Sequence, residues 1–365
     1  MPVGRLNLLS DRMRFGAAVG GVAFSVALIL LIQALYAGYQ ESVKSFVTNV
    51  PADIWVGQAG AFDLFRSTSI VTPALRAQVA AKPGVQGMSE LRGRQSSFTF
   101  DGMSIRSLFL GFSPVADEGV SKALGIERLP GPGEIIISDY IHKKSGLAKG
   151  DKVVVSGMEL LVVDELTIKS PPFGSFSIIN FDDTNTMFDM GGDFTYLLVL
   201  AQDRAAIPQM VTDMQTIKGV TVYEKSAFSA SNSRTVDEFL PVIAVLLVVS
   251  YLVGVVITGL TIYTATIEKT RDYGVLKAIG ASNSYVYRIV IFQSLAVSVL
   301  GFAIGFPLAL LASRLAESSV PEFITNYEPM SVLFVFTAVL VMGLIASWLP
   351  VRRIIAIDPA IVFRA

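Results

Sequence analysis

Four long stretches of the sequence contain no charged residue, and they limit the possible folds more than any other feature. They cover residues 15–40, 239–267, 289–313 and 329–351. Each is longer than the roughly 20 residues that an α-helix needs to cross the hydrocarbon core of a membrane. Charged residues make up only 16% of the chain, whereas a soluble domain has about 25%. The sequence therefore predicts an α-helical membrane protein with four transmembrane helices.

The first stretch follows Arg12 and Arg14, much as the apolar region of a signal peptide follows its basic residues. A signal peptide, however, has an apolar region of only about 7–15 residues and a small-residue cleavage site. Residues 15–40 are too long for that role. We therefore expect an uncleaved transmembrane helix behind a short amphipathic N-terminal segment, 1–14.

Basic residues gather in three segments between or beyond the predicted spans. Segments 1–14, 268–288 and 352–365 together hold ten Lys and Arg but only four Asp and Glu. Short segments rich in basic residues stay on the cytoplasmic side. We therefore expect both termini and the 268–288 connector to be cytoplasmic, and region 41–238 and loop 314–328 to be extracytoplasmic.

Region 41–238 is long enough for a folded domain, and its pattern mixes strands and helices. Thr72 followed by Pro73 is typical of a helix start, because threonine caps the first turn and proline fits the first helical position. Each end of the region shows a βαβ-like pattern, and the middle, 133–165, suggests a small β-rich subdomain. The expected strands are 53–57, 85–91, 96–100, 134–138, 152–156, 158–163, 196–200 and 220–223, and the flanking helices are 72–81 and 203–217.

The residue types that catalysis or metal binding needs are scarce. The chain has no cysteine and a single histidine, His142, which excludes thiol nucleophiles, iron–sulfur clusters and multi-histidine metal sites within one chain. Asp182, Asp183, Asp189 and Asp193 cluster without the spacing of a calcium loop, so we interpret them as a solvated acidic loop. The sequence has no Gly-x-x-x-x-Gly-Lys-(Ser/Thr) phosphate loop. We predict no catalytic residue, metal or cofactor in this chain, and no nucleic-acid partner.

The connector between the second and third spans combines charge with an amphipathic pattern. Tyr273, Leu276 and either Ile279 or Gly280 fall at three- to four-residue spacing and so share one face of a helix. Gly280 also suits the position after a helix end, and Ser282 or Asn283 can cap the next helix. Two interpretations remain: a solvated connector held near lipid headgroups, or a helix that docks into a groove of another protein. The charged residues of the segment are Glu268, Lys269, Arg271, Asp272 and Lys277.

The 268–282 segment resembles the signature of the FtsX-like, MacB-type ABC transporter permeases, a four-span family of type VII ABC exporters. Asp272 stands where that signature usually has Glu, Tyr273 replaces an aliphatic residue, and Ile279 replaces Leu. The tail at 358–365 also resembles the ending of the family. The order of one span, a large outside domain and three further spans matches along the whole chain.

This resemblance implies that the permease and the ATPase are separate subunits. Two copies of the permease, itself not an enzyme, would work with two copies of a separate ABC ATPase that binds ATP and Mg, in a bacterial inner membrane. Closure of the ATPase dimer would move the large outside domain. This movement would export a hydrophobic or amphipathic substrate (a lipid, glycolipid, haem or drug), or would activate an extracytoplasmic partner enzyme without transport. An intramembrane enzyme or sensor is a third interpretation, but it leaves the connector unexplained. The residues implied to contact the ATPase are Glu268, Lys269, Arg271, Asp272, Tyr273, Leu276, Lys277 and Gly280.

Two further groups of residues are candidates for function within the spans. Gln33, Tyr36 and Tyr39, at the outer end of the first span, are candidates for a substrate-access site, although interfacial anchoring is the simpler explanation of the tyrosines. Small-x-x-x-small spacing lets two helices approach closely, either within one chain or between copies. The resemblance places the first two spans at a dimer interface. The glycines with this spacing are Gly16, Gly20, Gly301 and Gly305.

Overall fold

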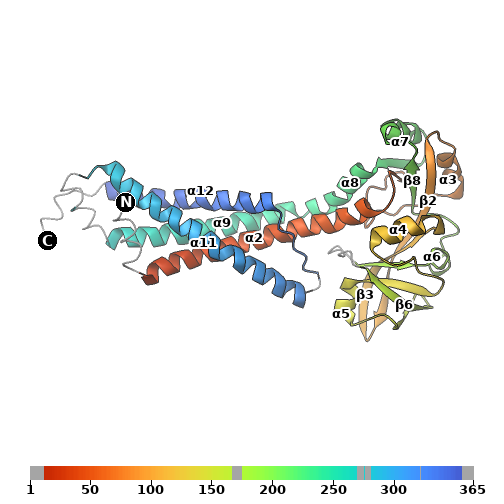
Figure 1. Ribbon diagram of the computed structural model, residues 1–365, viewed down its shortest axis with the longest axis horizontal. Helices are drawn as coiled ribbons and strands as arrows, with labels where there is room; N and C mark the ends of the chain where they lie inside the picture. The colour runs from red at the N-terminus through yellow and green to blue at the C-terminus, as the bar shows by residue number, and fades with distance from the viewer. Residues whose placement is uncertain (1–11, 167–174, 269–274, 276–280, 321, 356–365) are drawn as a thin grey trace. The chain divides into compact units, whose positions relative to one another are not determined.

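A computed structural model of the chain describes residues 12–166, 175–268, 275, 281–320 and 322–355 (Figure 1). The chain divides into two compact units. The helical unit contains Met1–Ala37, Leu240–Ser319 and Thr325–Ala365. The α/β unit contains Gly38–Phe239 together with Val320–Ile324.

Four long helices supply the apolar stretches. Each has a segment long and apolar enough to cross a membrane: Phe15–Asn49, Leu240–Leu260, Tyr287–Ser319 and Pro329–Trp348. The predicted class of four membrane helices with a mixed α/β domain is thus confirmed. The four helices are α2 (Arg12–Asn49), α9 (Leu240–Glu268), α11 (Asn283–Ser319) and α12 (Pro329–Ile355).

Two glycines allow α11 to pack closely against α2 within the helical unit. A Cβ atom added to Gly305 would lie 2.6 Å from the backbone oxygen of Ala23, and one added to Gly301 would clash with Val22. No real Cβ approaches a backbone oxygen that closely, so only glycine fits at Gly305. The packing of Gly301 and Gly305 is therefore between two helices of one chain.

The α/β unit is built on one sheet of nine strands, in the order β5-β6-β4-β7-β3-β2-β8-β1-β9, among the residues that the structure describes. Short helices connect these strands (Figure 1). The strands are β1 (Ile54–Gln58), β2 (Val85–Phe100), β3 (Met103–Phe112), β4 (Glu134–Ser138), β5 (Lys152–Val155), β6 (Met158–Leu166), β7 (Ser175–Ile179), β8 (Tyr196–Ala201) and β9 (Val220–Glu224). The helices are α3 (Pro73–Ala80), α4 (Asp117–Leu124), α5 (Asp139–Ser145), α6 (Phe181–Phe188), α7 (Ile207–Gln215) and α8 (Lys225–Asp237), with 3₁₀ turns at Pro114–Ala116 and Arg204–Ala206.

The two flanks form interleaved βαβ units. In the first, β1 and β2 are parallel to each other because both pair antiparallel with β8, which lies between them. In the second, β8 and β9 both pair antiparallel with β1, which lies between them. The helices of the two units, α3 and α7, contribute Val79, Met210 and Met214 to one apolar cluster. Each flank therefore completes the other, which the sequence pattern did not show.

The central part of the sheet differs from the sequence expectation in two ways. Residues 92–95, expected to separate two strands, are part of one 16-residue strand, β2, because β3 pairs with it from Leu91 to Phe100. The central strands also continue the flank sheet, since β7 pairs parallel with β3. The β-rich part still has its own apolar cluster, with Ile135, Ile137 and Val153 at its centre.

Helix caps account for two local features of the sequence. Thr72 caps α3, and its Oγ1 accepts a 3.4 Å hydrogen bond from the backbone N–H of Leu75, as predicted. The interpretation of Asp182 and Asp183 as part of a solvated loop is wrong, because both lie in the first turn of α6 behind the cap Asn180. Carboxylates are favourable there because the N-terminus of a helix carries partial positive charge.

Candidate functional site

The predicted coupling segment lies almost entirely outside the described residues. Glu268 is the last residue of α9. On the other side of the segment, Ser282 caps α11, and its Oγ accepts a 3.3 Å hydrogen bond from the backbone N–H of Tyr285. A distinct helix start after the connector is thus confirmed. The coupling role remains a prediction for Lys269, Arg271, Asp272, Tyr273, Leu276, Lys277 and Gly280.

The three residues at the outer end of the first span have different surroundings. Tyr39 donates a 3.1 Å hydrogen bond to the backbone oxygen of Glu322. Glu322 lies in the loop between α11 and α12, called the outer loop here because the sequence predicts it to be extracytoplasmic. The side-chain oxygen of Gln33 is buried and has no hydrogen-bond partner among the described residues. Tyr36 lies between them on α2 and is half-buried. Tyr39 is therefore an anchor for the outer loop, and Gln33 keeps an unused acceptor.

The side chain of Glu322 joins the outer loop to α5 within the α/β unit. Its Oε1 accepts hydrogen bonds from the Tyr140 hydroxyl at 2.8 Å and from Lys144 Nζ at 2.9 Å. Lys144 Nζ also donates to the Tyr140 hydroxyl at 2.6 Å. We call Tyr39, Tyr140, Lys144 and Glu322 the outer-loop cluster.

The outer-loop cluster favours the charged forms of its acid and its base. Burial alone would raise the pKa of the Glu322 carboxyl, but the hydrogen bonds from Lys144 and Tyr140 outweigh it and hold the pKa below its ordinary value. Hydrogen bonds to Tyr140 and Glu322 raise the pKa of Lys144. The ion pair is therefore present across the whole neutral range.

A second set of contacts connects α8 to the loop at residues 61–70, which follows β1. The buried carboxylate of Asp63 accepts hydrogen bonds through Oδ1 from the backbone N–H groups of Phe65, Arg66 and Ser67, at 2.6–3.1 Å. Its Oδ2 accepts a 2.9 Å bond from the hydroxyl of Thr235 on α8. A fully buried carboxylate is stable only when hydrogen-bonded in this way. The fold of the loop thus depends on a side chain of α8.

Two more contacts strengthen this connection. Asn232 on α8 accepts a 2.8 Å hydrogen bond from the backbone N–H of Leu64. Arg66 Nη1 lies 2.6 Å from Glu238 Oε2 in an exposed ion pair. Glu238 directly follows α8, and α9 begins two residues later at Leu240. The 61–70 loop is therefore fixed to the helix that continues into the second span.

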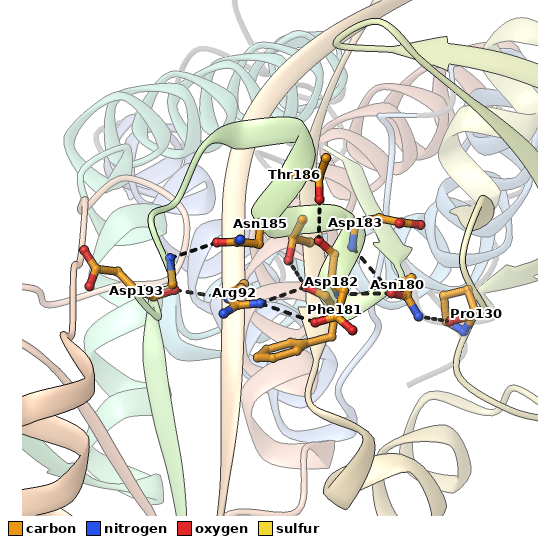
Figure 2. A network of polar contacts seen from close by, with 11 residues as sticks. Arg92, Pro130, Asn180, Phe181, Asp182, Asp183, Asn185, Thr186 and Asp193 are labelled. Carbon is orange, nitrogen blue, oxygen red and sulfur yellow. Dashed lines mark hydrogen bonds and ion pairs between the residues drawn. The ribbon is translucent and has the colours of Figure 1, made fainter.

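The buried guanidinium of Arg92 holds β2, α6 and the residues before β8 together (Figure 2). Its central carbon lies over the rings of both Phe181 and Phe194, 4.1 Å and 5.3 Å from the two centroids, which are themselves 6.4 Å apart. The guanidinium donates 3.1 Å hydrogen bonds to the backbone oxygens of Asp193 and Phe181. Burial lowers its pKa, partly opposed by Asp182. These partners fill the site, so we assign Arg92 a structural role.

Sequence reasoning missed the residues that make these long-range contacts. Asp63 and Thr235 are 172 residues apart, and Lys144 and Glu322 are 178 apart. Neither pair lies in a recognisable motif. A single signal was available for Asp63: it is the one acidic residue in the stretch 61–70, whose other residues, apart from Arg66, are apolar or carry a hydroxyl.

Comparisons with known proteins agree with the architecture. Residues 244–359 match the family profile described as FtsX-like permease C-terminal. An uncharacterized ABC transporter permease of Mycobacterium tuberculosis is 23% identical over 353 residues, which cover 96% of each chain. A second one from that organism is 24% identical over 345 residues, covering 94% of this chain and 93% of the relative. The macrolide export ATP-binding/permease protein MacB of Escherichia coli K12 is 25% identical over 258 residues, covering 64% of this chain and 38% of MacB.

Two solved extracytoplasmic domains are also similar. The extracellular domain of YknZ from Gram-positive bacteria aligns with 47% of this chain and 99% of its own length, at 14% identity and a TM-score of 0.35. The periplasmic region of MacB from Actinobacillus actinomycetemcomitans aligns with 51% of this chain and 94% of its own length, at 8% identity and a TM-score of 0.36.

The match to the family profile begins inside α9 and extends past the end of α12, so it includes the connector that carries the signature. The similarity to the mycobacterial permeases extends across the α/β unit as well. Residues 244–359 thus form an FtsX-like permease C-terminal region, and the chain is similar over nearly its whole length to ABC transporter permeases.

Proposed function

We propose that this permease couples ATP hydrolysis by a separate ATPase to movement of its α/β unit, and that this movement exports a hydrophobic or amphipathic substrate. The observation that carries the proposal is the attachment of the 61–70 loop to α8 through Asp63 and Thr235. Because α8 continues into α9 after two residues, a displacement of the second span pulls directly on this buried hydrogen bond.

Two observations support a separate ATPase. The relative MacB is by name both ATP-binding protein and permease, and this chain covers 38% of it. The present sequence has no phosphate loop. We therefore propose that ATP and Mg bind to another polypeptide, which docks on the connector at residues 268–280.

The composition of the spans supports an amphipathic or hydrophobic substrate. None of the stretches 15–40, 239–267, 289–313 and 329–351 contains an acidic or basic residue. Proton relays and ion pathways normally require such residues inside the membrane. A substrate handled at the outer leaflet does not.

The free faces of α2 and α9 support a second copy of the chain as partner. A Cβ added at Gly16 or Gly20 meets no described atom within 4 Å, in contrast to Gly305. On α9, Val245, Val256 and Leu260 are each more than 60% exposed. Small residues on one helix and bare apolar side chains on the next are suited to helix–helix contact in lipid. We propose a homodimer through α2 and α9, in a bacterial inner membrane with both termini cytoplasmic.

A purely mechanical role is the second candidate, and the outer-loop cluster favours it. Two of the connections from the spans to the α/β unit, α8 and the 320–324 segment, are held there by side-chain hydrogen bonds. Such contacts transmit movement whether or not a substrate passes. In this case an extracytoplasmic partner enzyme would be activated by the α/β unit.

The test is ATP turnover in lipid nanodiscs after co-purification of the chain with a candidate ATPase. Leu276→Asp places a charge on the proposed docking face. Val275→Asp is the matched control, because Val275 is exposed and, in the helix that the sequence predicts, would face about 100° away from Leu276. We expect Leu276→Asp to abolish binding and coupled turnover and Val275→Asp to retain both. Equal behaviour of the two variants would contradict the docking role.

Addition of candidate lipids, porphyrins or drugs to the same assay separates the two functions. An exporter is stimulated by its substrate in the absence of other proteins. A mechanical switch is insensitive to all of them and responds instead to an extracytoplasmic partner enzyme, whose activity would rise with ATP turnover.

A further inference from the structure

The α/β unit contains a cavity of about 300 Å³ beside β2. Its origin lies in the sheet: β8 pairs with β2 only as far as Leu91, so no strand lies next to Gly93 and Gln95 on that side. The 61–70 loop crosses the space left open and forms the opposite wall. The floor comes from Leu108 and Leu110 of β3.

The lining of this cavity combines positive charge with apolar surface. Arg66 and Arg94 line it, and no acidic residue does. The side chain of Arg94 is exposed and has no ion pair or hydrogen bond within the described part of the chain. Ser67, Ser69 and Thr195 also line it, but their hydroxyls already bond to the backbone. The apolar lining residues are Leu64, Phe65, Ile70, Leu108, Leu110 and Met190.

We propose that this cavity binds a small amphipathic anion, with the anionic group on Arg94 and the apolar part against Phe65, Ile70 and Met190, apolar lining residues that keep exposed surface. A carboxylate or phosphate matches an unpaired guanidinium, which donates in a planar fork. The cavity lies at the lower end of the volume range of small-molecule sites, which fits one short apolar tail and a head group.

The position of Arg66 makes binding dependent on α8. Its guanidinium is held by Glu238, directly after α8, while the rest of its loop forms the cavity wall. Because Arg66 also lines the cavity, an anion bound at Arg94 attracts the Arg66 guanidinium and so competes with Glu238 for it. Binding therefore loosens the contact between the loop and the start of the second span, and withdrawal of Glu238 by that span in turn strengthens binding.

Calorimetry on the full chain in phosphatidylcholine nanodiscs tests the site, with empty nanodiscs as the blank. The probe is octanoate, compared with 1-octanol, which lacks the charge, and acetate, which lacks the tail. We expect saturable binding of one octanoate per chain, at least about tenfold tighter than octanol or acetate, as the loss of one charge-assisted hydrogen bond implies. Equal binding of octanoate and octanol, or no saturable binding, overturns the proposal.

Variants identify the residues. Arg94→Gln is expected to lower the affinity for octanoate about tenfold or more, and Arg94→Lys is expected to lower it less. Arg106→Gln is the matched control, because Arg106 is also exposed but does not line the cavity. Glu238→Gln is expected to tighten binding roughly two- to fivefold by releasing Arg66, which is the range for an exposed ion pair. Wild-type affinity in Arg94→Gln overturns the proposal.

The source of the anion is found by replacing part of the phosphatidylcholine with phosphatidylglycerol. A fall in octanoate affinity assigns the site to a lipid head group, and an unchanged affinity assigns it to a free amphiphile. The site rests on the proposed function only if the anion is the exported substrate. Because binding is measured without an ATPase, a failure here is distinct from a failure of Leu276→Asp to uncouple turnover.

Discussion

Glu322 and Lys144 form a 2.9 Å ion pair although 178 residues separate them in the sequence. Glu322 lies in the short connection between α11 and α12, and Lys144 lies on α5. An ion pair between partly exposed side chains contributes at most about 1 kcal/mol to stability. Its importance is therefore positional, because it fixes the 320–324 segment to the α/β unit.

We predict that Glu322→Gln changes coupling more than stability. The substitution removes the charge while keeping the size of the side chain. Thermal unfolding of the α/β unit should shift by only a few degrees or less, because the pair is partly exposed. ATP turnover in nanodiscs should lose its response to substrate or partner. Asp139→Asn is the control, since it removes the exposed ion pair of Asp139 with Lys143 on the same helix.

The outer-loop cluster also predicts a dependence on pH. The folded-state pKa of Glu322 lies below its ordinary value of 4.5, so its contribution to stability is present above that value and is lost as pH falls through the folded pKa. The pKa of Lys144 is raised, so its contribution is lost only as pH rises beyond the ordinary lysine value of 10.5. The difference in Tm between wild type and Glu322→Gln should be constant from about pH 6 to about pH 9 and should decrease in acid. A difference that grows in acid would contradict the assignment.

Asp63 should be far less tolerant of substitution. Asp63→Ala leaves three backbone N–H groups of the 61–70 loop and the Thr235 hydroxyl without their acceptor. Each unsatisfied buried donor costs about 1–3 kcal/mol. We expect a loss of at least about 3 kcal/mol in the free energy of unfolding, measured by urea titration.

Thr235→Val isolates the contact with α8. It removes a single hydrogen bond to Asp63 and should cost about 1–2 kcal/mol. Thr212→Val on α7 is the control, because its exposed hydroxyl bonds only to the backbone oxygen of Pro208 within the same helix. If α8 transmits movement through this contact, Thr235→Val also lowers coupled ATP turnover and Thr212→Val does not.

Arg92 tests whether a guanidinium, rather than a positive charge, is needed against the rings of Phe181 and Phe194. The ammonium group of lysine has no planar face to lie against the two rings, and it cannot donate to both backbone oxygens as the forked guanidinium does. Arg92→Lys should therefore destabilise the α/β unit by about 2–4 kcal/mol, the cost of two lost hydrogen bonds to a charged group and the ring contacts. Arg106→Lys, on an exposed position of β3, should have no measurable effect.

The features that the sequence predicted depend on residues close together in the chain, and the features that it missed depend on residues far apart. The spans and the cap at Thr72 depend on residues within one helix, so their pattern is readable directly. The continuity of β2 through Arg92–Gln95 depends on pairing with β3, and the interleaving of the flanks depends on β8 lying between β1 and β2. Asp63 meets Thr235 only after this sheet has formed. The described candidate contacts are of this second kind, which explains why the sequence predicted the class of protein and missed them.

The glycines of the spans give the sharpest test of packing against assembly. Gly305→Ala should destabilise the isolated chain, since the new Cβ would lie 2.6 Å from the Ala23 oxygen. Gly20→Ala meets nothing within 4 Å and should be neutral or slightly stabilising, because alanine favours helix more than glycine does. Gly20→Ile then tests the second copy: a bulky residue at this position should weaken self-association in nanodiscs while leaving the unfolding temperature of the monomer unchanged. Because Gly305→Ala acts within one chain and Gly20→Ile acts between chains, single-molecule subunit counting combined with thermal unfolding distinguishes them. Undiminished association of Gly20→Ile would exclude this face of α2 from the dimer interface.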